Sequence, residues 1–327
     1  MSALRYAAHK TLETLQIYWE LVRIMVPVTI VTEVMSRTGL IELAAPALAP
    51  IMGLFGLPPE LGLAWLTGML VGIWGAIATI FTLVPVTSMS VADITVFSSL
   101  VLIAHGLPIE QKIIQKAGPG FAITTMIRIA GAIAYAMILH HVYAATGWLS
   151  EPVDPAWAPT VVSNDWFGFF AGLGEALFYM LAILLSLAWG LEALKVTGIM
   201  TLLMRFLAPA LRLAGIRGEA GQFTAVGLFL GISYGGGLLI REARSGRLSS
   251  RQVFISCVFM GFAHSIIEDT IIVVALGADV LGVLAGRLMF AVAATALIAH
   301  FLRSVPDEAL LHGCFGKRTA NSDRPAD

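Results

Sequence analysis

The chain has 327 residues, of which 58% are hydrophobic and 13% are charged, and its formal net charge is −1. A soluble domain carries roughly 25% charged residues, so this composition excludes an ordinary soluble protein. The net charge itself says nothing about a nucleic-acid partner, and we expect none. The composition predicts an integral membrane protein whose surface contacts the lipid bilayer.

Apolar stretches long enough to cross a bilayer recur along the chain, for example at 61–81, 121–140 and 171–191. Backbone groups in lipid need hydrogen-bond partners within their own segment, and these runs are continuous rather than alternating. The predicted fold class is therefore an all-α polytopic membrane protein. The N-terminal residues lack the apolar core and cleavage site of a signal peptide, so we expect the first span to be retained.

The sequence contains an internal repeat with one constant offset. His105 and His264 are 159 residues apart, and the run AHGLPIE at 104–110 aligns at this offset with AHSIIED at 263–269. The same offset pairs residues that chance seldom aligns, namely Glu33 with Glu192, Pro50 with Pro209, Gly72 with Gly231, Arg128 with Arg287 and His141 with His300. We interpret this alignment as a duplication of about half the chain.

Each copy is predicted to contain five hydrophobic segments. They lie at 17–37, 40–57, 61–84, 91–107 and 119–145 in the first copy, and at 168–192, 198–215, 220–240, 252–276 and 284–303 in the second. The second segment of each copy is short and contains Pro50 or Pro209, so an interfacial or a re-entrant segment is an alternative to a full span.

Basic residues indicate how the copies face, because short cytoplasmic loops retain Lys and Arg. The loop after the third segment of the second copy holds Arg241, Arg244, Arg247 and Arg251, whereas its counterpart at 82–93 has no basic residue. This asymmetry predicts an inverted internal repeat of about 5 + 5 transmembrane segments, with both termini cytoplasmic. The predicted organisation is a cytoplasmic N-terminal segment at 1–16, a first repeat at 17–146, an external linker at 147–165, a second repeat at 166–303 and a cytoplasmic polar tail at 304–327.

Three ionisable residues, His264, Glu268 and Asp269, lie in a stretch that is otherwise apolar. A charged group at the bilayer centre costs roughly 2.5 to 3.5 kcal/mol, so we expect these side chains to face the protein interior as a site for substrate or a coupling ion. On an unbroken helix, His264 and Glu268 would share one face. The alternative is a helix that ends here, with the three side chains solvated at the membrane surface.

The matching run of the first copy has His105 and Glu110, with Gly106 and Pro108 between them. Proline disrupts the preceding helical turn, so we expect a helix break that exposes backbone groups to an ion or a substrate. In the second copy, His264, Glu268 and Asp269 are candidate metal ligands, although the spacing is unspecific and the zinc-protease HExxH is absent.

Glycines are concentrated at 227–237 (GLFLGISYGGG) and at the aligned run 68–78 (GMLVGIWGAIA). Small residues allow close packing of transmembrane helices. Alternatively, Ser233, Tyr234 and bare backbone line a substrate path.

Two further pairs of charged residues align between the copies. Arg128 and Arg287 open the last segment of each copy, and they are either counter-ions to the carboxylates or interfacial anchors. Glu33 and Glu192 lie at the ends of the first segments, where we expect solvated helix ends.

No GxxxxGK[ST] motif is present, so we expect no nucleotide hydrolysis and no cofactor. An intramembrane hydrolase would need a nucleophile paired with a base, and no such pair is in register. We therefore expect a protein that is not an enzyme.

The repeat, the glycine-rich third segment and the run AHSIIEDT at 263–270 together resemble the nucleoside-recognition (Gate) domain membrane proteins. That group includes the spore maturation proteins A and B and the membrane core of the ferrous-iron transporter B, and the resemblance covers about 17–303. It implies a paired-gate permease of the bacterial inner membrane, with substrates from metal ions to small organic solutes. The nucleotide-binding G domain of the iron transporters has no counterpart in this sequence, which argues against GTP-coupled iron transport.

We predict a secondary transporter that moves a small solute or ion through a site between the two repeats. Its predicted site residues are His105, Glu110, His264, Glu268 and Asp269. The alternative is a non-transporting membrane scaffold that acts with a membrane partner protein, and a homo-oligomer is compatible with either function.

Overall fold

The structure is a computed structural model that describes residues 3–153, 155 and 165–305. Much of the predicted external linker and nearly all of the predicted polar tail lie outside the described residues. Within the described part the chain consists of helices, turns and loops, and no strand is present. The all-α prediction is therefore confirmed for these residues.

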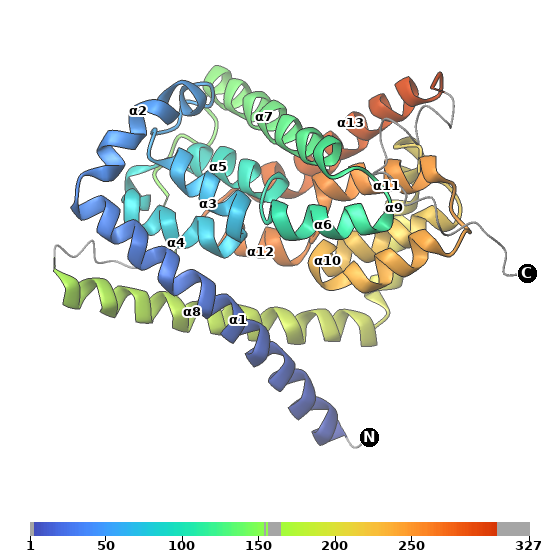
Figure 1. Ribbon diagram of the computed structural model, residues 1–327, viewed down its shortest axis with the longest axis horizontal. Coiled ribbons are helices and arrows are strands. Elements are labelled where there is room, and N and C mark those ends of the chain that lie inside the picture. Colours follow the sequence, from blue (N-terminus) through green and yellow to red (C-terminus); the bar gives the residue numbers. More distant parts are fainter. Residues whose placement is uncertain (1–2, 154, 156–164, 306–327) are drawn as a thin grey trace, which may run out of the picture. The chain divides into compact units, whose positions relative to one another are not determined.

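Apart from the stretch at 147–165 between α7 and α8, short connections join successive helices (Figure 1). Their bounds are α1 Ala3–Arg37, α2 Leu40–Gly53, α3 Leu61–Val71, α4 Ile73–Leu83, η1 Val86–Ser88, α5 Val91–Ile103, α6 Leu107–Ala117, α7 Phe121–Thr146, α8 Trp166–Val196, α9 Ile199–Leu213, α10 Glu219–Arg244, α11 Ser250–Ala263, α12 Glu268–Ala275, η2 Leu281–Gly286 and α13 Arg287–Leu302. The short second segment of each copy is a short helix, α2 or α9, and each contains its predicted proline.

Five helical stretches of the described chain are long and apolar enough to cross a membrane by length and composition. They are Val91–Ala117, Phe121–Thr146, Trp166–Gly190, Ser250–Ala275 and Leu281–Leu302, and they coincide with five of the ten predicted segments. The predicted segment at 61–84 is instead divided into two shorter apolar helices, α3 and α4. The third segment of the first copy is therefore not one continuous helix.

The helices form two compact units, and each unit contains segments from both copies of the repeat. The first unit comprises Met1–Gly106, Ala132–Arg205 and Ile267–Gly286, and the second comprises Leu107–Gly131, Phe206–Ile266 and Arg287–Asp327. In the first unit α1 packs on α8 and α4, and α5 packs on α3, α4, α12 and η2. Two of the boundaries between the units fall after Gly106 and after Ile266, close in sequence to His105 and His264.

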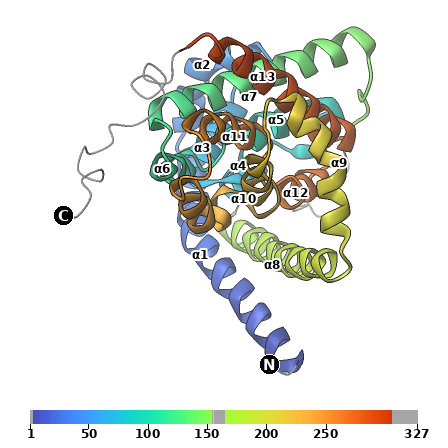
Figure 2. The same cartoon turned by 90° about the vertical axis from the view of Figure 1, so that its right-hand side faces the viewer.

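In the second unit α6 packs along α10, α10 along α11, and α11 along α13 (Figure 2). The core of this unit is a cluster of buried side chains from α6, α10 and α11, namely Ile114, Phe223, Ile232, Leu239, Val253, Cys257 and Met260. In lipid such helices are held together by close van der Waals packing, which small residues permit. Gly227 is one such residue, because a Cβ atom there would lie 2.1 Å from Sδ of Met260.

Local backbone features recur at the offset of 159 residues. Ser90 and Ser249 are aligned, and each is the N-cap of the following helix, where its hydroxyl accepts a backbone N–H. Positive φ angles also recur at aligned positions, at Gly39 and Gly198, Gly56 and Gly215, Gly72 and Gly231, Gly106 and Ser265, and Gly118 and Gly277. The local structure thus repeats with the sequence, while the opposite orientation of the two copies stays a prediction.

Candidate functional site

Each copy has a helix break at its histidine. In the first copy α5 ends at Ile103 and α6 begins at Leu107, so the predicted break is confirmed. Pro108 is the second residue of α6, where a helix tolerates the missing N–H, and the break itself falls at the preceding residues, which include Gly106 with a φ of 56°.

The expectation that His264 and Glu268 share one face of an unbroken helix is wrong. Helix α11 ends at Ala263, His264 is its C-cap in an extended conformation, and Glu268 is the first residue of α12. The interruption is made by Ser265, which has a φ of 47° in the left-handed region. A residue in this conformation cannot continue the helical hydrogen-bond ladder.

Both breaks lie against the third segment of their own copy. The N–H of Gly106 donates to the carbonyl of Gly68 at 2.9 Å, and the aligned N–H of Ser265 lies 3.4 Å from the carbonyl of Gly227. The third segment is itself interrupted one turn later, at Gly72 with a φ of 123° and at Gly231 with a φ of 77°. Each unit thus contains two interrupted helices, and the backbone donor freed at one break is satisfied by the other helix.

The two aligned histidines have the same orientation. Nδ1 of His105 lies 2.9 Å from the carbonyl oxygen of Val101, and Nδ1 of His264 lies 3.0 Å from that of Met260. A carbonyl oxygen only accepts hydrogen bonds, so Nδ1 carries the hydrogen in both rings. Nε2 of each buried ring is therefore the atom that meets another group.

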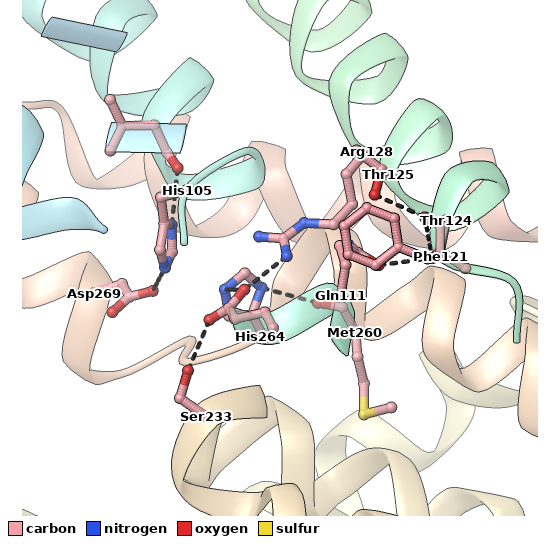
Figure 3. A network of polar contacts seen from close by, with 12 residues as sticks. His105, Gln111, Phe121, Thr124, Thr125, Arg128, Ser233, Met260, His264 and Asp269 are labelled. Atoms are coloured by element: carbon pink, nitrogen blue, oxygen red, sulfur yellow. Dashed lines mark hydrogen bonds and ion pairs between the residues drawn. The ribbon is translucent and has the colours of Figure 1, made fainter. Parts of the chain in front are cut away.

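In the first unit, Nε2 of His105 faces Oδ2 of Asp269 at 3.5 Å, as Figure 3 shows. Both side chains are buried. The histidine is at the end of α5 and the aspartate is in the first turn of α12, so two segments far apart in the sequence supply the pair.

In the second unit, Nε2 of His264 faces Oε2 of Glu110 at 3.3 Å. The same carboxylate oxygen accepts from Nη1 of Arg128 at 2.6 Å, and the hydroxyl of Ser233 lies 3.4 Å from Oε1 (Figure 3). Arg128 is 2% exposed and His264 is fully buried. Glu110 on α6 therefore accepts from α7, lies near the hydroxyl from α10 and faces the imidazole at the end of α11, so it contacts all three segments.

The remaining arginine of this network, Arg287, binds the end of α11. Its Nε donates to the carbonyl of Phe262 at 2.8 Å and its Nη2 to the carbonyl of His264 at 2.9 Å. A cation at the C-terminal end of a helix is stabilised by the carbonyl groups that have no intrahelical partner. Neither arginine lies at an exposed position, so their burial does not fit the interfacial-anchor interpretation.

The two His–carboxylate pairs are equivalent under the repeat. The offset aligns His105 with His264 and Glu110 with Asp269. Each pair takes its histidine from one copy and its carboxylate from the other, within a single unit. The alignment of AHGLPIE with AHSIIED indicates the equivalence of these residues, but it does not indicate which histidine meets which carboxylate.

The other predicted site residues are less involved. The side chain of Tyr234 lies outside the described residues. Glu268 begins α12, and the described part of the chain offers its carboxylate neither a hydrogen bond nor an ion pair. Within its own unit, each pair offers a metal ion one imidazole nitrogen and one carboxylate oxygen.

Glu33 and Glu192 lie apart from these pairs. The carboxylate of Glu33 forms an ion pair with Arg37 one helical turn later, at 2.6 Å. The carboxylate of Glu192 accepts from the hydroxyl of Tyr6 at 2.5 Å, and this hydrogen bond raises the pKa of Tyr6 above its ordinary value. Both contacts belong to the first unit. The contact of Glu33 lies within α1, and that of Glu192 joins α8 to α1.

Comparison with known proteins places the chain among membrane proteins. It is similar to the "Uncharacterized membrane protein YvoD" of Bacillus subtilis (strain 168), with 26% identity over 297 residues that cover 87% of this chain and 91% of that protein. No protein-family model matches the chain, and no solved structure matches it. Together with its long apolar helices, this similarity identifies the chain as a helical membrane protein.

Proposed function

We propose that the protein is a secondary transporter that moves a small solute or ion across the bacterial inner membrane and performs no chemical step on it. The observation that carries this proposal is the pair of equivalent His–carboxylate contacts, His105 with Asp269 and His264 with Glu110. Both are buried, and both lie at helix breaks.

Burying ionisable side chains in a membrane protein costs free energy, so their presence indicates a function. Ionisable residues inside membrane segments are rare, and they mark pathways for ions, protons and substrates. Interrupted helices are tolerated at membrane depth where the freed backbone groups are satisfied by protein or line a path. A scaffold needs only packed helix faces, so it offers no reason to keep two such contacts at aligned positions.

The inverted repeat and the Gate-domain relationship belong to the same proposal. Support for the repeat comes from the aligned N-cap serines and the aligned residues with positive φ. Support for opposite orientations comes from the four arginines at 241–251, which have no basic counterpart at 82–93. In this arrangement both termini are cytoplasmic, and each pair draws on both repeats, as transporter sites at repeat interfaces do.

The test begins with the purified chain and a thermal-shift screen against metal ions, nucleosides and organic acids. A ligand that binds the folded state raises the melting temperature as its concentration exceeds its dissociation constant. Each stabilising ligand is then offered to sealed vesicles that contain the protein. We expect uptake that falls at least about tenfold in Asp269→Asn and in Glu110→Gln, a loss of roughly 1.4 kcal/mol.

Glu33→Gln is the matched control, because it removes a carboxylate of the same length as that of Glu110, from an ion pair with Arg37 one turn later on the same helix. Pairs at i and i+4 on a helix contribute about 0.3 to 0.5 kcal/mol, so uptake should stay close to the wild-type rate. Uptake that depends on Glu33 and not on Asp269 or Glu110 would place the site elsewhere. Vesicles that take up none of the stabilising ligands would favour the scaffold function.

A further inference from the structure

The tautomers of His105 and His264 leave each pair short of one hydrogen. Because Nδ1 donates to a backbone carbonyl in both rings, Nε2 of the neutral ring has a lone pair and no hydrogen. The atom that faces it is a carboxylate oxygen, at 3.5 Å for Asp269 and at 3.3 Å for Glu110. Two acceptor atoms thus face each other in a buried site, and a proton between them would turn each contact into a hydrogen bond from Nε2 to the carboxylate oxygen.

We propose that each pair binds a proton in the transport cycle, so that the proton is the coupling ion. This inference rests on the proposed transport function and names the ion for the same residues. The proton is taken from water on one side of the membrane and forms an N–H bond at Nε2, which donates to the carboxylate oxygen. When that N–H bond breaks, the proton passes to water on the other side, and the ring returns to its neutral form.

The groups around His264 determine how tightly this proton is held. The carboxylate of Glu110 on α6 faces the ring as an anion, and Arg128 on α7 and Arg287 on α13 place two cations around the same pair. Ser233 on α10 contributes a neutral hydroxyl to the other oxygen of Glu110. One anion and two cations thus surround this ring, which is a different charge environment from that of a ring beside a carboxylate alone.

Around His105, Asp269 on α12 is a charged group of the same unit at 3.5 Å, and Glu268 is the neighbouring residue on that helix. The segments packed around the end of α5 in that unit, α3, α4, α12 and η2, contain no lysine or arginine along their described lengths. The two pairs therefore have the same geometry in different local charge environments, and they should take up their protons at different pH values.

The experiment is nitrogen-15 NMR of the full chain in lipid bilayers with labelled histidine, recorded from about pH 5 to about pH 8, where histidine ordinarily titrates. The chain has 7 histidines, which single His→Gln variants assign. His141 is an internal reference, because its Nδ1 makes the same backbone contact, 2.7 Å from the carbonyl of Met137, on an exposed surface.

We expect His105, His141 and His264 to show the Nδ1–H tautomer, and Nε2 of His105 and His264 to gain a hydrogen as the pH falls. In Glu110→Gln the pH response of His264 should be lost and that of His105 kept, and in Asp269→Asn the reverse should hold. Since each variant tests one pair alone, failure of one variant to fold leaves the other test intact.

Three results would overturn the proposal. They are a hydrogen on Nε2 of both rings throughout the pH range, a His264 response that survives Glu110→Gln, and one equivalent of Zn²⁺ shifting both Nε2 signals at neutral pH. The last result would make the ligand a metal ion rather than a proton. The spectra report proton binding whether or not any solute is moved, so a protonating pair in vesicles without uptake would refute transport alone.

Discussion

Replacing Gly231 by alanine tests whether the interruption of α10 is built into the fold. Gly231 has a φ of 77° and a ψ of 163°, a region that is essentially restricted to glycine. A Cβ atom at this position would also lie 2.4 Å from Oγ of Ser265, the residue that interrupts the chain after α11. The substitution therefore strains both interruptions of the second unit together.

The cost follows from these two contacts. A residue with a side chain in this conformation costs about 1 to 3 kcal/mol. Turning the Ser265 hydroxyl away from its rotamer adds about 0.5 to 1.5 kcal/mol. Since 1 kcal/mol corresponds to roughly 2 to 4 °C in a domain of some 150 to 250 residues, we expect Gly231→Ala to lower the melting temperature in detergent by at least about 3 °C.

Gly237→Ala is the matched control on the same helix, because a Cβ atom there meets nothing within 4 Å. Alanine favours a helix over glycine by up to about 1 kcal/mol, so the melting temperature should stay the same or rise. The double variant Gly231→Ala, Ser265→Ala should recover the part of the loss that comes from the hydroxyl. If Gly231→Ala melts within about 1 °C of the wild type, the interruption is not required and the reasoning is wrong.

Two further predictions concern the buried ion pair and the orientation of the chain. Arg128→Gln should destabilise the protein by about 3 to 5 kcal/mol, because it leaves the buried carboxylate of Glu110 without this cation. In a double-mutant cycle with Glu110→Gln, the combined loss of stability should be smaller than the sum of the two single losses. Single cysteines can be placed in the loops at 86–92 and 242–250 of a chain without native cysteines. In intact cells, an impermeant reagent should label the first loop strongly and the second weakly. Equal labelling of the two loops would contradict opposite orientations of the copies.

Much of the helical fold was predictable from the sequence, because continuous apolar runs in lipid can only be helices. The break after α11 was not predictable in the same way. In the first copy Gly106 and Pro108 indicate an interruption, whereas the aligned residues of the second copy, Ser265 and Ile267, do not. Serine rarely adopts a positive φ, and it does so here in contact with Gly231, which lies in another helix. A long-range contact of this kind leaves no local signal in the sequence.

The glycine-rich third segment illustrates a choice that spacing leaves open. The close-packing interpretation applies to Gly227, which faces Met260, while Gly231 four residues later interrupts the helix. Both glycines have aligned partners in the first copy, so the repeat marks them equally. Only the backbone conformation separates a glycine needed for close approach from one needed for its φ angle.

The carboxylate partner of each histidine could not be predicted from closeness in the sequence. His105 and Glu110 are close in the chain, as are His264, Glu268 and Asp269, so helical spacing favours partners within each copy. The repeat contains a better signal, because Glu110 aligns with Asp269 whereas Glu268 aligns with Ile109. The position that is acidic in both copies is the one that meets a histidine in the structure.

Reciprocal pairing has a consequence for how the two copies depend on each other. In a symmetric dimer, each contact between two different residues occurs twice, once in each direction across the interface. The same holds here, because one copy supplies His105 and Glu110 and the other supplies Asp269 and His264 as their partners. A change at Glu110 alters the pair of His264, and a change at His105 alters the pair of Asp269, although both residues belong to the first copy. Each of the two pairs takes its histidine from one half of the sequence and its carboxylate from the other, and this is a structural reason to expect the two halves to depend on each other.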